Sequence, residues 1–300
     1  MPPVARLALP LLAALLGLAT LPVHGQGGGA RERSIFVTVT DQDGAPVTGL
    51  SPSEFVVRED GRRREVLGAF QATEPVTVAL MVDNSAAAEP YVADMRSALK
   101  AFVERIGGKY PTALTTVAER PRIRVEYTLD KQALLEGVQR IFAVPGSAAY
   151  FVEGLLELSR GLAARDFERA AIVAITAEGP EYSERHYTQA LPQLRESGAM
   201  FEAFVLSSRG GPDLREEGSR SRSILLDRGT RETGGDRIEL LTSMGLERAL
   251  ANLAARLEAQ HKVTYARPES LIPPEKIEVA VTRPGLTARG TPARPAGTAR

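Results

Sequence analysis

Patterns typical of buried strands and of helices alternate along the middle of this chain, from about residue 76 to residue 266. Residues 76–82 form a near-continuous apolar run, which is typical of a strand buried on both faces of a parallel sheet. Residues 91–106 then show helical periodicity, with apolar positions on one face at Val92, Met95, Leu99, Phe102 and Ile106. This alternation predicts an α/β fold in which a doubly wound, mostly parallel sheet carries helices on both faces.

The rest of the middle region continues the pattern. Further strands are expected at 112–117, 123–128, 170–175, 200–206 and 262–266, and further helices at 131–142, 149–162, 186–196 and 246–260. A short turn joins the first two of these strands, so they should be antiparallel neighbours. The polar segment 207–222, rich in Gly, Ser and Arg, is expected to be a mobile loop, with a short helical turn at 224–228 after it.

Ligands of doubly wound folds bind beyond the carboxyl ends of the parallel strands. In this sequence that rim is expected to carry residues 83–87, 147–150 and 176–181 and the loop that starts at residue 207. Any functional site of the domain is therefore sought first in these segments.

Residues that flank the α/β region have the period-two pattern of half-buried strands. Strands are expected at 35–40, 55–58 and 65–70, within a small β module that spans 34–72, and again at 276–282 within a C-terminal segment that spans 267–283. A sheet this small is marginal alone. We therefore expect the two ends of the chain to meet in one small sheet beside the α/β domain.

The two termini have compositions of their own. Arg6 precedes an apolar run at 7–18, and small residues precede Gln26, so residues 1–25 are interpreted as a secretory signal peptide. The alternative is an uncleaved anchor, for which the run is short. Residues 26–33 are expected to be a flexible leader and 284–300 a disordered tail. The mature protein would be exported, periplasmic or secreted, without a membrane span.

Composition narrows the function classes. Lys plus Arg and Asp plus Glu both number 37, so the formal net charge is +0 and nothing favours nucleic acid as a partner. The chain has no cysteine, which excludes disulfides, thiolate metal sites and cysteine nucleophiles. Of the 3 histidines, only His186 and His261 would remain after removal of residues 1–25, so a multi-histidine metal site is excluded as well.

One motif follows the first buried strand. The segment Asp83-Asn84-Ser85-Ala86-Ala87 resembles the Asp-x-Ser-x-Ser motif of the metal-ion-dependent adhesion site in von Willebrand factor type A domains. The flanks VTVTDQDGAPVTGLSPSEFVVREDG (37–61) and RETGGDRIEL (231–240) resemble those of secreted proteins of acidobacterial type that carry this domain. The resemblance covers about residues 76–266 and implies a Rossmann-like fold that binds a protein partner.

The resemblance also implies a ligand set for a divalent cation. In the family, the Asp and both Ser of the motif, a Thr from a second loop and an Asp from a third loop hold the ion. Asp83 and Ser85 match, whereas Ala87 replaces the second Ser. Ser147 matches the Thr only if the loop register shifts, and Glu178, beside Ala177, is the longer substitute for the Asp. The implied metal residues are thus Asp83, Ser85 and Glu178.

A competing interpretation is that Asp83 and Ser85 serve the local hydrogen bonds of a strand-to-helix turn. Because Mg²⁺ requires near-ideal octahedral ligands, the eroded set predicts an affinity no better than about millimolar, and no cofactor is assigned. Ser183, Glu184 and His186 lie close together in sequence but lack a nucleophile elbow, so no catalytic residue is assigned.

The sequence therefore predicts an exported, non-catalytic protein-binding domain with a degenerate adhesion site, whose partner lies outside the cytoplasm. Two alternatives remain open. One is a hydrolytic enzyme that uses an unrecognised Asp, Glu and Ser site on the same rim. The other is a structural spacer in the cell envelope, in which the β flanks make the contacts.

Overall fold

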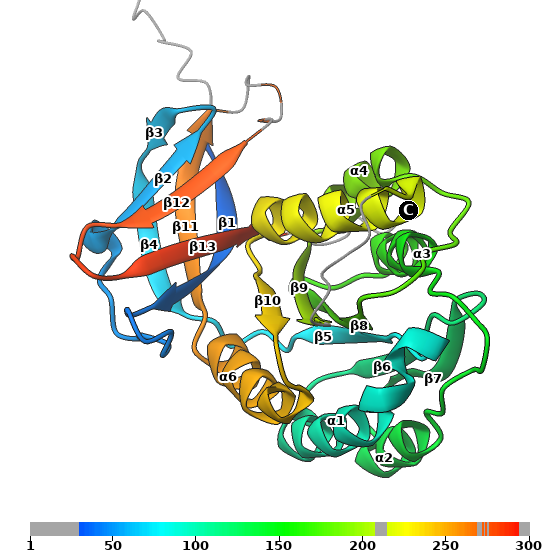
Figure 1. Ribbon diagram of the computed structural model, residues 1–300. Helices are drawn as coiled ribbons and strands as arrows, with labels where there is room; N and C mark the ends of the chain where they lie inside the picture. The colour runs from blue at the N-terminus through cyan, green and yellow to red at the C-terminus, as the bar shows by residue number, and fades with distance from the viewer. Residues whose placement is uncertain (1–29, 208–214, 269–271, 273, 275, 294–300) are drawn as a thin grey trace, which may run out of the picture.

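The strand order of the central sheet defines the architecture. Figure 1 shows the computed structural model, which describes residues 30–207, 215–268, 272, 274 and 276–293. Within these residues the central sheet has the order β10-β9-β8-β5-β6-β7, and only the β6–β7 pair is antiparallel. Its strands are β5 Thr77–Val82, β6 Thr112–Thr116, β7 Arg122–Thr128, β8 Ala170–Ala177, β9 Ala199–Leu206 and β10 Arg237–Leu240. The expected doubly wound, mostly parallel sheet is confirmed.

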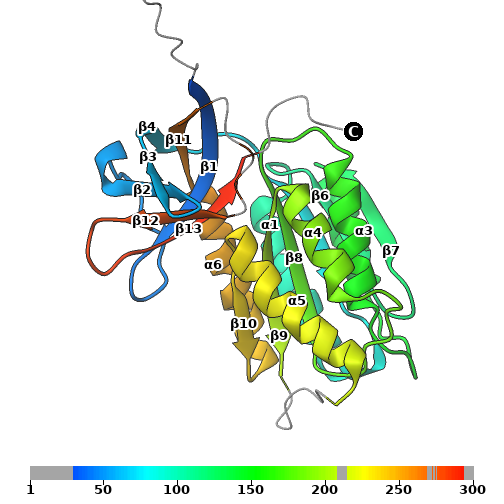
Figure 2. The ribbon, with the colours of Figure 1, turned by 90° about the horizontal axis from the view of Figure 1, so that it is seen from above.

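Helices cover both faces of this sheet because its strands are apolar on both sides. Val78, Leu80 and Val82 of β5 belong to the core under one helical layer, and Ala79 and Met81 to the core under the other. The first layer consists of α1 Val92–Ile106, α2 Lys131–Gln139 and α6 Leu246–Glu258. The second consists of α3 Phe151–Ala163, α4 Tyr187–Ser197 and α5 Glu217–Thr233. Figure 2 shows α3, α4 and α5 side by side on one face.

Helix α5 corrects the expectation of a mobile loop at 207–222. Residues 217–222 are helical and continue without a break to Thr233, so the short turn expected at 224–228 is the middle of a long helix. Residues 208–214 lie outside the described residues. The helix escaped prediction because the face that it buries contains small or polar side chains, such as Ser219, Ser221 and Thr230, instead of an apolar stripe.

Two small sheets form the β module beside this domain (Figure 1). One has the order β13-β1-β11-β4 and the other β12-β2-β3. Their strands are β1 Ala30–Thr40, β2 Phe55–Glu59, β3 Arg62–Arg64, β4 Val66–Gln71, β11 His261–Pro268, β12 Ile277–Val281 and β13 Thr287–Pro292. The two ends of the chain meet as expected, since β12 pairs with β2 from Ile277 opposite Glu59 to Val281 opposite Phe55, but the described strands form two sheets instead of the one expected. A shared apolar core lies between the two sheets.

Three segments differ from the expected boundaries of the module. The strand expected at 262–266 in the central sheet is β11, which pairs with β1 and β4. Residues 30–33, expected in a flexible leader, belong to β1, and residues 287–292, expected in a disordered tail, form β13. Each of the three obtains its backbone partners from the module, which the sequence order does not reveal. The expected signal peptide, the leader residues 26–29 and the last residues, 294–300, lie outside the described residues.

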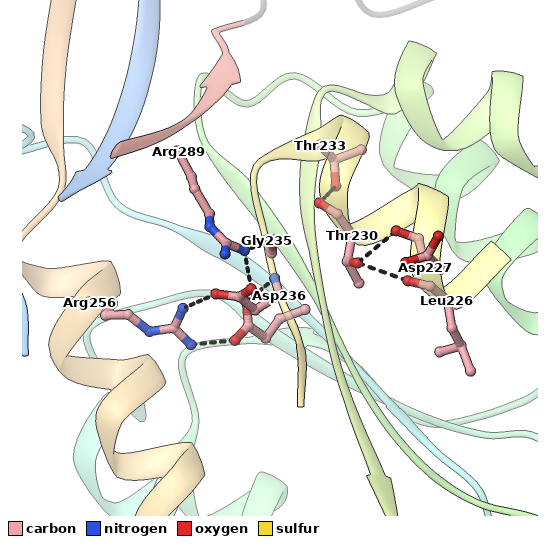
Figure 3. A network of polar contacts seen from close by, with 9 residues as sticks. Leu226, Asp227, Thr230, Thr233, Gly235, Asp236, Arg256 and Arg289 are labelled. Carbon is pink, nitrogen blue, oxygen red and sulfur yellow. Dashed lines mark hydrogen bonds and ion pairs between the residues drawn. The ribbon is translucent and has the colours of Figure 1, made fainter. Parts of the chain in front are cut away.

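A polar network joins the module to the α/β domain (Figure 3). The Glu202 carboxylate on β9 forms an ion pair with Arg256 on α6 and accepts the main-chain N–H of Asp236 at 2.9 Å. Arg256 also pairs with Asp236 at 3.5 Å. Arg289 of β13 contacts the Asp236 carboxylate and donates to the carbonyl of Gly235 at 2.9 Å. These contacts hold β13 against the loop between α5 and β10.

None of the helices in the described part of the chain is both long and apolar enough to cross a lipid bilayer.

Candidate functional site

Asp83 lies where β5 ends, at the rim predicted to carry the site, and it is buried. Its Oδ1 accepts the main-chain N–H of Ser85 at 2.9 Å. Its Oδ2 accepts the hydroxyl of Thr176 at 2.9 Å and the N–H of Ala177 at 3.2 Å. The carboxylate therefore joins the turn after β5 to the turn after β8, which is the local bonding that the competing interpretation of the motif predicts.

The next two side chains of the motif are also buried, but they differ in their bonding. Asn84 donates from Nδ2 to the carbonyl of Phe142 at 2.9 Å, and its Oδ1 accepts the N–H of Ala118 at 3.1 Å. It therefore fixes two further rim loops. The Oγ of Ser85, in contrast, is buried and has no hydrogen-bond partner among the described residues. A buried hydroxyl of this kind fits a ligand or ion that approaches from the rim.

The other positions that correspond to metal ligands in the family offer fewer side-chain oxygen atoms. Ala87 lies against Gly179, so the position of the second motif Ser presents a methyl group to the third loop. The Ser147 hydroxyl donates to the carbonyl of Val144 at 2.7 Å, within its own loop. Ala177, at the position of the family's Asp, contributes only its main chain: its N–H to Asp83 and its carbonyl to Arg222 at 3.3 Å.

Glu178 lies on the α5 side of the third loop. Its main-chain N–H donates to the carbonyl of Leu206 at 3.2 Å, and its side chain lines a small crevice with Arg222 and Arg237. The structure thus brings together Asp83, Ser85 and Thr176, and it places Glu178 beside the arginines of α5 and β10. In the described part of the chain, no three His, Asp or Glu side chains gather as a metal-binding group.

These observations test whether the residues fit Mg²⁺. An octahedral site would need several oxygen ligands at about 2.0–2.1 Å in fixed directions. Here the hydroxyl of Ser85 and the remaining lone pairs of Asp83 are available, but two of the family's positions carry methyl groups. The residues present therefore do not fit a family-type Mg²⁺ site, and no chemical step is derived through a metal.

Sequence reasoning missed two buried charged residues near the rim, Glu181 and Arg222. The buried carboxylate of Glu181 accepts the N–H groups of Phe151 and Val152 at 3.1 and 3.4 Å, so it caps the N-terminus of α3. Burial raises the pKa of Glu181, and the hydroxyl of Ser183 and the charge of Arg222 oppose that shift. Arg222 is buried and donates to the carbonyl of Gly179 at 2.9 Å.

The residues near His186, including Ser183, form local hydrogen bonds at the ends of helices. Ser183 donates its hydroxyl to Glu181 and accepts the N–H of Glu153 at 3.1 Å. His186 is the N-cap of α4, and its Nδ1 accepts the N–H of Thr188. These local bonds account for the cluster as helix caps. A carboxylate within the loop between β8 and α4 gives no sequence signal of its own, which is why Glu181 was missed.

Large apolar side chains are exposed on loops at the carboxyl end of the sheet, the end at which Asp83 lies. Phe142 is 62% exposed and Tyr182 60% exposed, in the loops that precede α3 and α4. Leu241 and Met244, after β10, are 86% and 82% exposed. The loops contact one another, since Asn84 bonds Phe142 and the N–H of Tyr182 donates to Ala149 at 2.9 Å. These four side chains are called the apolar rim below.

Comparisons with known proteins give structural matches only. No protein-family model matches this sequence, and no curated protein matches it. Among solved structures, the D319A mutant of the PilB minor pilin from Streptococcus sanguinis is similar with 10% identity and a TM-score of 0.47, over 63% of this chain and 63% of that one. The present chain therefore spans less than two thirds of that pilin.

Two further structures carry the von Willebrand name. The vWF domain of the type V pili tip protein Mfa5 from Porphyromonas gingivalis is 12% identical with a TM-score of 0.46, over 62% of this chain and 96% of that one. A von Willebrand factor type A protein from Catenulispora acidiphila is 14% identical with a TM-score of 0.45, over 89% and 64%. What the chain itself shows is a doubly wound α/β fold, with β7 as an antiparallel edge strand and Asp83 at the carboxyl end of β5.

Proposed function

We propose that this chain is an exported, non-catalytic binding protein of the secreted type A-related kind, which holds a protein partner on the rim around Asp83. The observation that carries the proposal is the apolar rim. Phe142, Tyr182, Leu241 and Met244 come from three different loops, all at the end of the sheet where ligands of doubly wound folds bind. Large exposed apolar side chains at a ligand-binding edge are typical of sites that bind proteins.

The proposed binding does not depend on a metal ion. A metal ion bound to the Asp83 carboxylate would have to share it with its three protein hydrogen-bond donors or displace them. The adhesion site is therefore proposed to be degenerate, with Asp83 and Ser85 as its surviving family positions and Glu178 as a distant third. Mg²⁺ binding, if measured, is expected to be no stronger than about millimolar.

Export is proposed from the N-terminal sequence. A charged residue, an apolar run and small residues before Gln26 predict cleavage near Gly25, which leaves the strand that starts at Ala30 intact. Mass spectrometry of protein recovered from the producing cell should find a mature chain that begins near Gln26. Recovery of intact Met1 from the cytoplasmic fraction would contradict the proposal.

The test of the binding site is affinity capture with the mature protein and matched surface variants. Leu241→Ser combined with Met244→Ser changes two exposed rim positions, and Phe70→Ser changes a module position that is 72% exposed. We expect the rim variant to lose the partner and the Phe70→Ser variant to keep it, with the same result in EDTA. Each variant is first shown to be folded by circular dichroism.

The same experiment separates the alternatives. Loss of the partner with Phe70→Ser and its retention with the rim variant would favour a spacer that makes contacts through the β module. A panel of hydrolytic assays on the mature protein tests the enzyme alternative. Activity that disappears with Asp83→Asn, in a folded protein, would overturn the non-catalytic proposal.

A further inference from the structure

A small cavity lies between the edge strand β7 and helix α3, apart from the Asp83 motif. Its volume is about 150 Å³. Side chains of β6, β7 and α3 form it, and Ile123, which is 59% exposed, lies at its mouth. None of the apolar-rim residues lines it. The proposed function leaves this cavity without a role.

Irregular strand pairing opens the cavity. The β6–β7 register shifts between Thr112 and Leu114 and again between Leu114 and Thr115. As a result Val125 packs in the core beneath α2, whereas Tyr127, two residues further on, packs in the core beneath α3. In a regular strand, residues two apart point to the same face. Bulges of this kind redirect side chains and occur often beside functional sites.

Helix α3 contributes an open surface because Gly161 has no side chain. A Cβ atom added at Gly161 would meet only Nη1 of Arg165 within 4 Å, at 3.5 Å. Gly154, two turns earlier, is different, because a Cβ there would press on Val117 and Met81. Gly154 is thus required by close packing, whereas Gly161 leaves space that a larger residue could occupy.

Two buried hydroxyl groups on the cavity wall have no hydrogen-bond partner in the part of the chain that the structure describes. Thr115 is 2% exposed, and its Oγ1 has no hydrogen bond among the described residues. The same holds for the OH of Tyr127, which is buried and lines the same cavity. Burial raises the pKa of Tyr127 to about 12, so its OH remains a donor at neutral pH. An unpaired buried polar group is costly, so two in one cavity point to a ligand that pairs with them.

The remaining walls set the polarity and the charge of that ligand. Leu158, Ala113 and Ile123 provide apolar surface. The carboxylates of Glu126 and Glu157 line the cavity as well, together with the guanidinium of Arg165. The Cζ of Arg165 lies 4.7 Å from the centre of the Tyr127 ring, and Nη1 donates to the carbonyl of Gly161 at 2.8 Å. Two carboxylates against one committed cation disfavour an anionic ligand.

We propose that this cavity binds a neutral, ring-sized molecule that carries one hydroxyl group, such as a phenol, with its ring against Leu158 and Gly161 and its hydroxyl paired with Thr115 and Tyr127. The cavity volume agrees with the size of one aromatic ring, because an apolar protein cavity of about 150 Å³ accepts benzene. The combination of apolar walls with a few convergent polar groups is typical of small-molecule sites.

Phenol, toluene and benzoate are the probes, titrated into the mature protein and followed by calorimetry and NMR. The Thr115→Val, Tyr127→Phe double variant removes both hydroxyls with little change of shape. Gly161→Leu fills the cavity and improves helix propensity, so it should fold at least as well as the wild type. Arg160→Ala, at an exposed position on the same helix, is the matched control.

We expect phenol to bind the wild type and the Arg160→Ala variant equally, and benzoate to bind at least about tenfold more weakly. The double variant should weaken phenol binding at least about tenfold, which corresponds to 1.4 kcal/mol, and leave toluene binding within about twofold. Gly161→Leu should abolish binding of both. The proposal is overturned if phenol does not bind at 10 mM, which corresponds to about −2.7 kcal/mol, if Gly161→Leu leaves phenol binding intact, or if the double variant binds phenol as the wild type does.

Discussion

A single buried carboxylate, Asp83, holds two rim loops together through three hydrogen bonds. Asp83→Ala would leave the N–H groups of Ser85 and Ala177 and the hydroxyl of Thr176 without their acceptor. Because unpaired buried donors are costly, the free energy of unfolding should fall by roughly 3 kcal/mol or more. Urea denaturation measures this. Thr176→Val, which removes one of the three bonds without a change of shape, should cost only about 1 kcal/mol.

Asp83 is also the residue on which any metal binding at the rim would depend. Wild-type protein titrated with Mg²⁺ and Mn²⁺ should bind no more tightly than about millimolar, since the residues present do not complete an octahedral set. The contrary result would be micromolar binding that Asp83→Ala abolishes in a protein still folded by circular dichroism. In that case the buried hydroxyl of Ser85 would be an ion ligand, with Ser147 or Glu178 recruited beside it.

His261 gives a prediction on pH. It is buried in the module core, 5.3 Å from the Phe55 ring between ring centres, and neither ring nitrogen has a hydrogen-bond partner in the described part of the chain. Burial lowers the pKa of His261 below its ordinary 6.5, and the nearby Val37 carbonyl offsets only part of that shift. The unfolded chain therefore binds this proton at higher pH than the folded one.

Proton binding by His261 in the unfolded chain lowers the stability of the folded protein at low pH. Wild-type stability should decrease as the pH falls below about 6.5, at up to about 1.4 kcal/mol per pH unit, until the folded-state pKa is reached. His261→Leu removes this contribution, whereas contributions from carboxyl groups are common to both proteins and cancel in the difference. Unfolding free energies of the two proteins at pH 7.5 and 5.5 provide the test. Equal pH dependence would show that His261 is hydrated or paired in solution.

The individual residues of the rim were only partly predictable from sequence. Asp83 and Ser85 were located because they follow a recognisable apolar strand, and the strand's carboxyl end fixes their place. Glu181 and Arg222 were not, because their roles depend on a helix N-terminus and on carbonyl groups that only the folded chain brings near. The hydroxyls of Thr115 and Tyr127 were missed for a related reason, since the register shift in β6–β7 has no sequence signature.

At the scale of elements, apolar runs predicted the strands and helices of the central domain, but they did not assign each strand to a sheet. Strand β11 was expected in the central sheet. Its burial alternates between buried and intermediate from His261 to Arg267, which is the signature of a sheet with one covered face. The strands β8 and β9 are buried at every position. That contrast is present in the sequence as Val263 and Tyr265 alternating with Lys262 and Thr264.

Strand β13 provides a prediction at this scale. A Cβ atom at Gly290 would press on the end of the Ile35 side chain and lie 2.8 Å from Cγ1 of Val279, so β13 can lie between β1 and β12 only with glycine there. Gly290→Ala should lower the free energy of unfolding by about 1–3 kcal/mol through overpacking. Ile35→Val removes the nearest methyl group, and the double variant should therefore lose less than the sum of the two single variants. Additive losses would mean that β13 moves away instead.

At the scale of the whole molecule, the two folded parts share an interface that contains a buried charge (Figure 3). Glu202 is fully buried on β9 and depends on Arg256, whose side chain is 11% exposed. Asp236 then connects Arg256 to Arg289 on the module. The attachment of β13 is therefore coupled to the core of the α/β domain, and disturbance of the buried pair should be felt by both parts.

Arg256→Met tests this coupling. It leaves the Glu202 carboxylate buried without its cation, which should cost about 3–5 kcal/mol, whereas Arg289→Ala, at a position whose side chain is 42% exposed, should cost no more than about 1 kcal/mol. Burial raises the pKa of Glu202 even with Arg256 present. Without Arg256 the protonated form is favoured further, so the loss in Arg256→Met should be largest at pH 8 and should shrink as the pH falls through the folded-state pKa of Glu202.

The Glu202→Gln, Arg256→Met double variant completes the cycle. With no buried charge left, it should recover most of the stability that Arg256→Met loses at pH 8 and should lack the additional pH dependence. Urea denaturation followed by far-UV circular dichroism measures the four proteins, and one cooperative transition is expected because the network spans both parts. Additive losses that do not vary with pH would mean that water already solvates Glu202, and the interface would then depend on the packing of β13 and α6 alone.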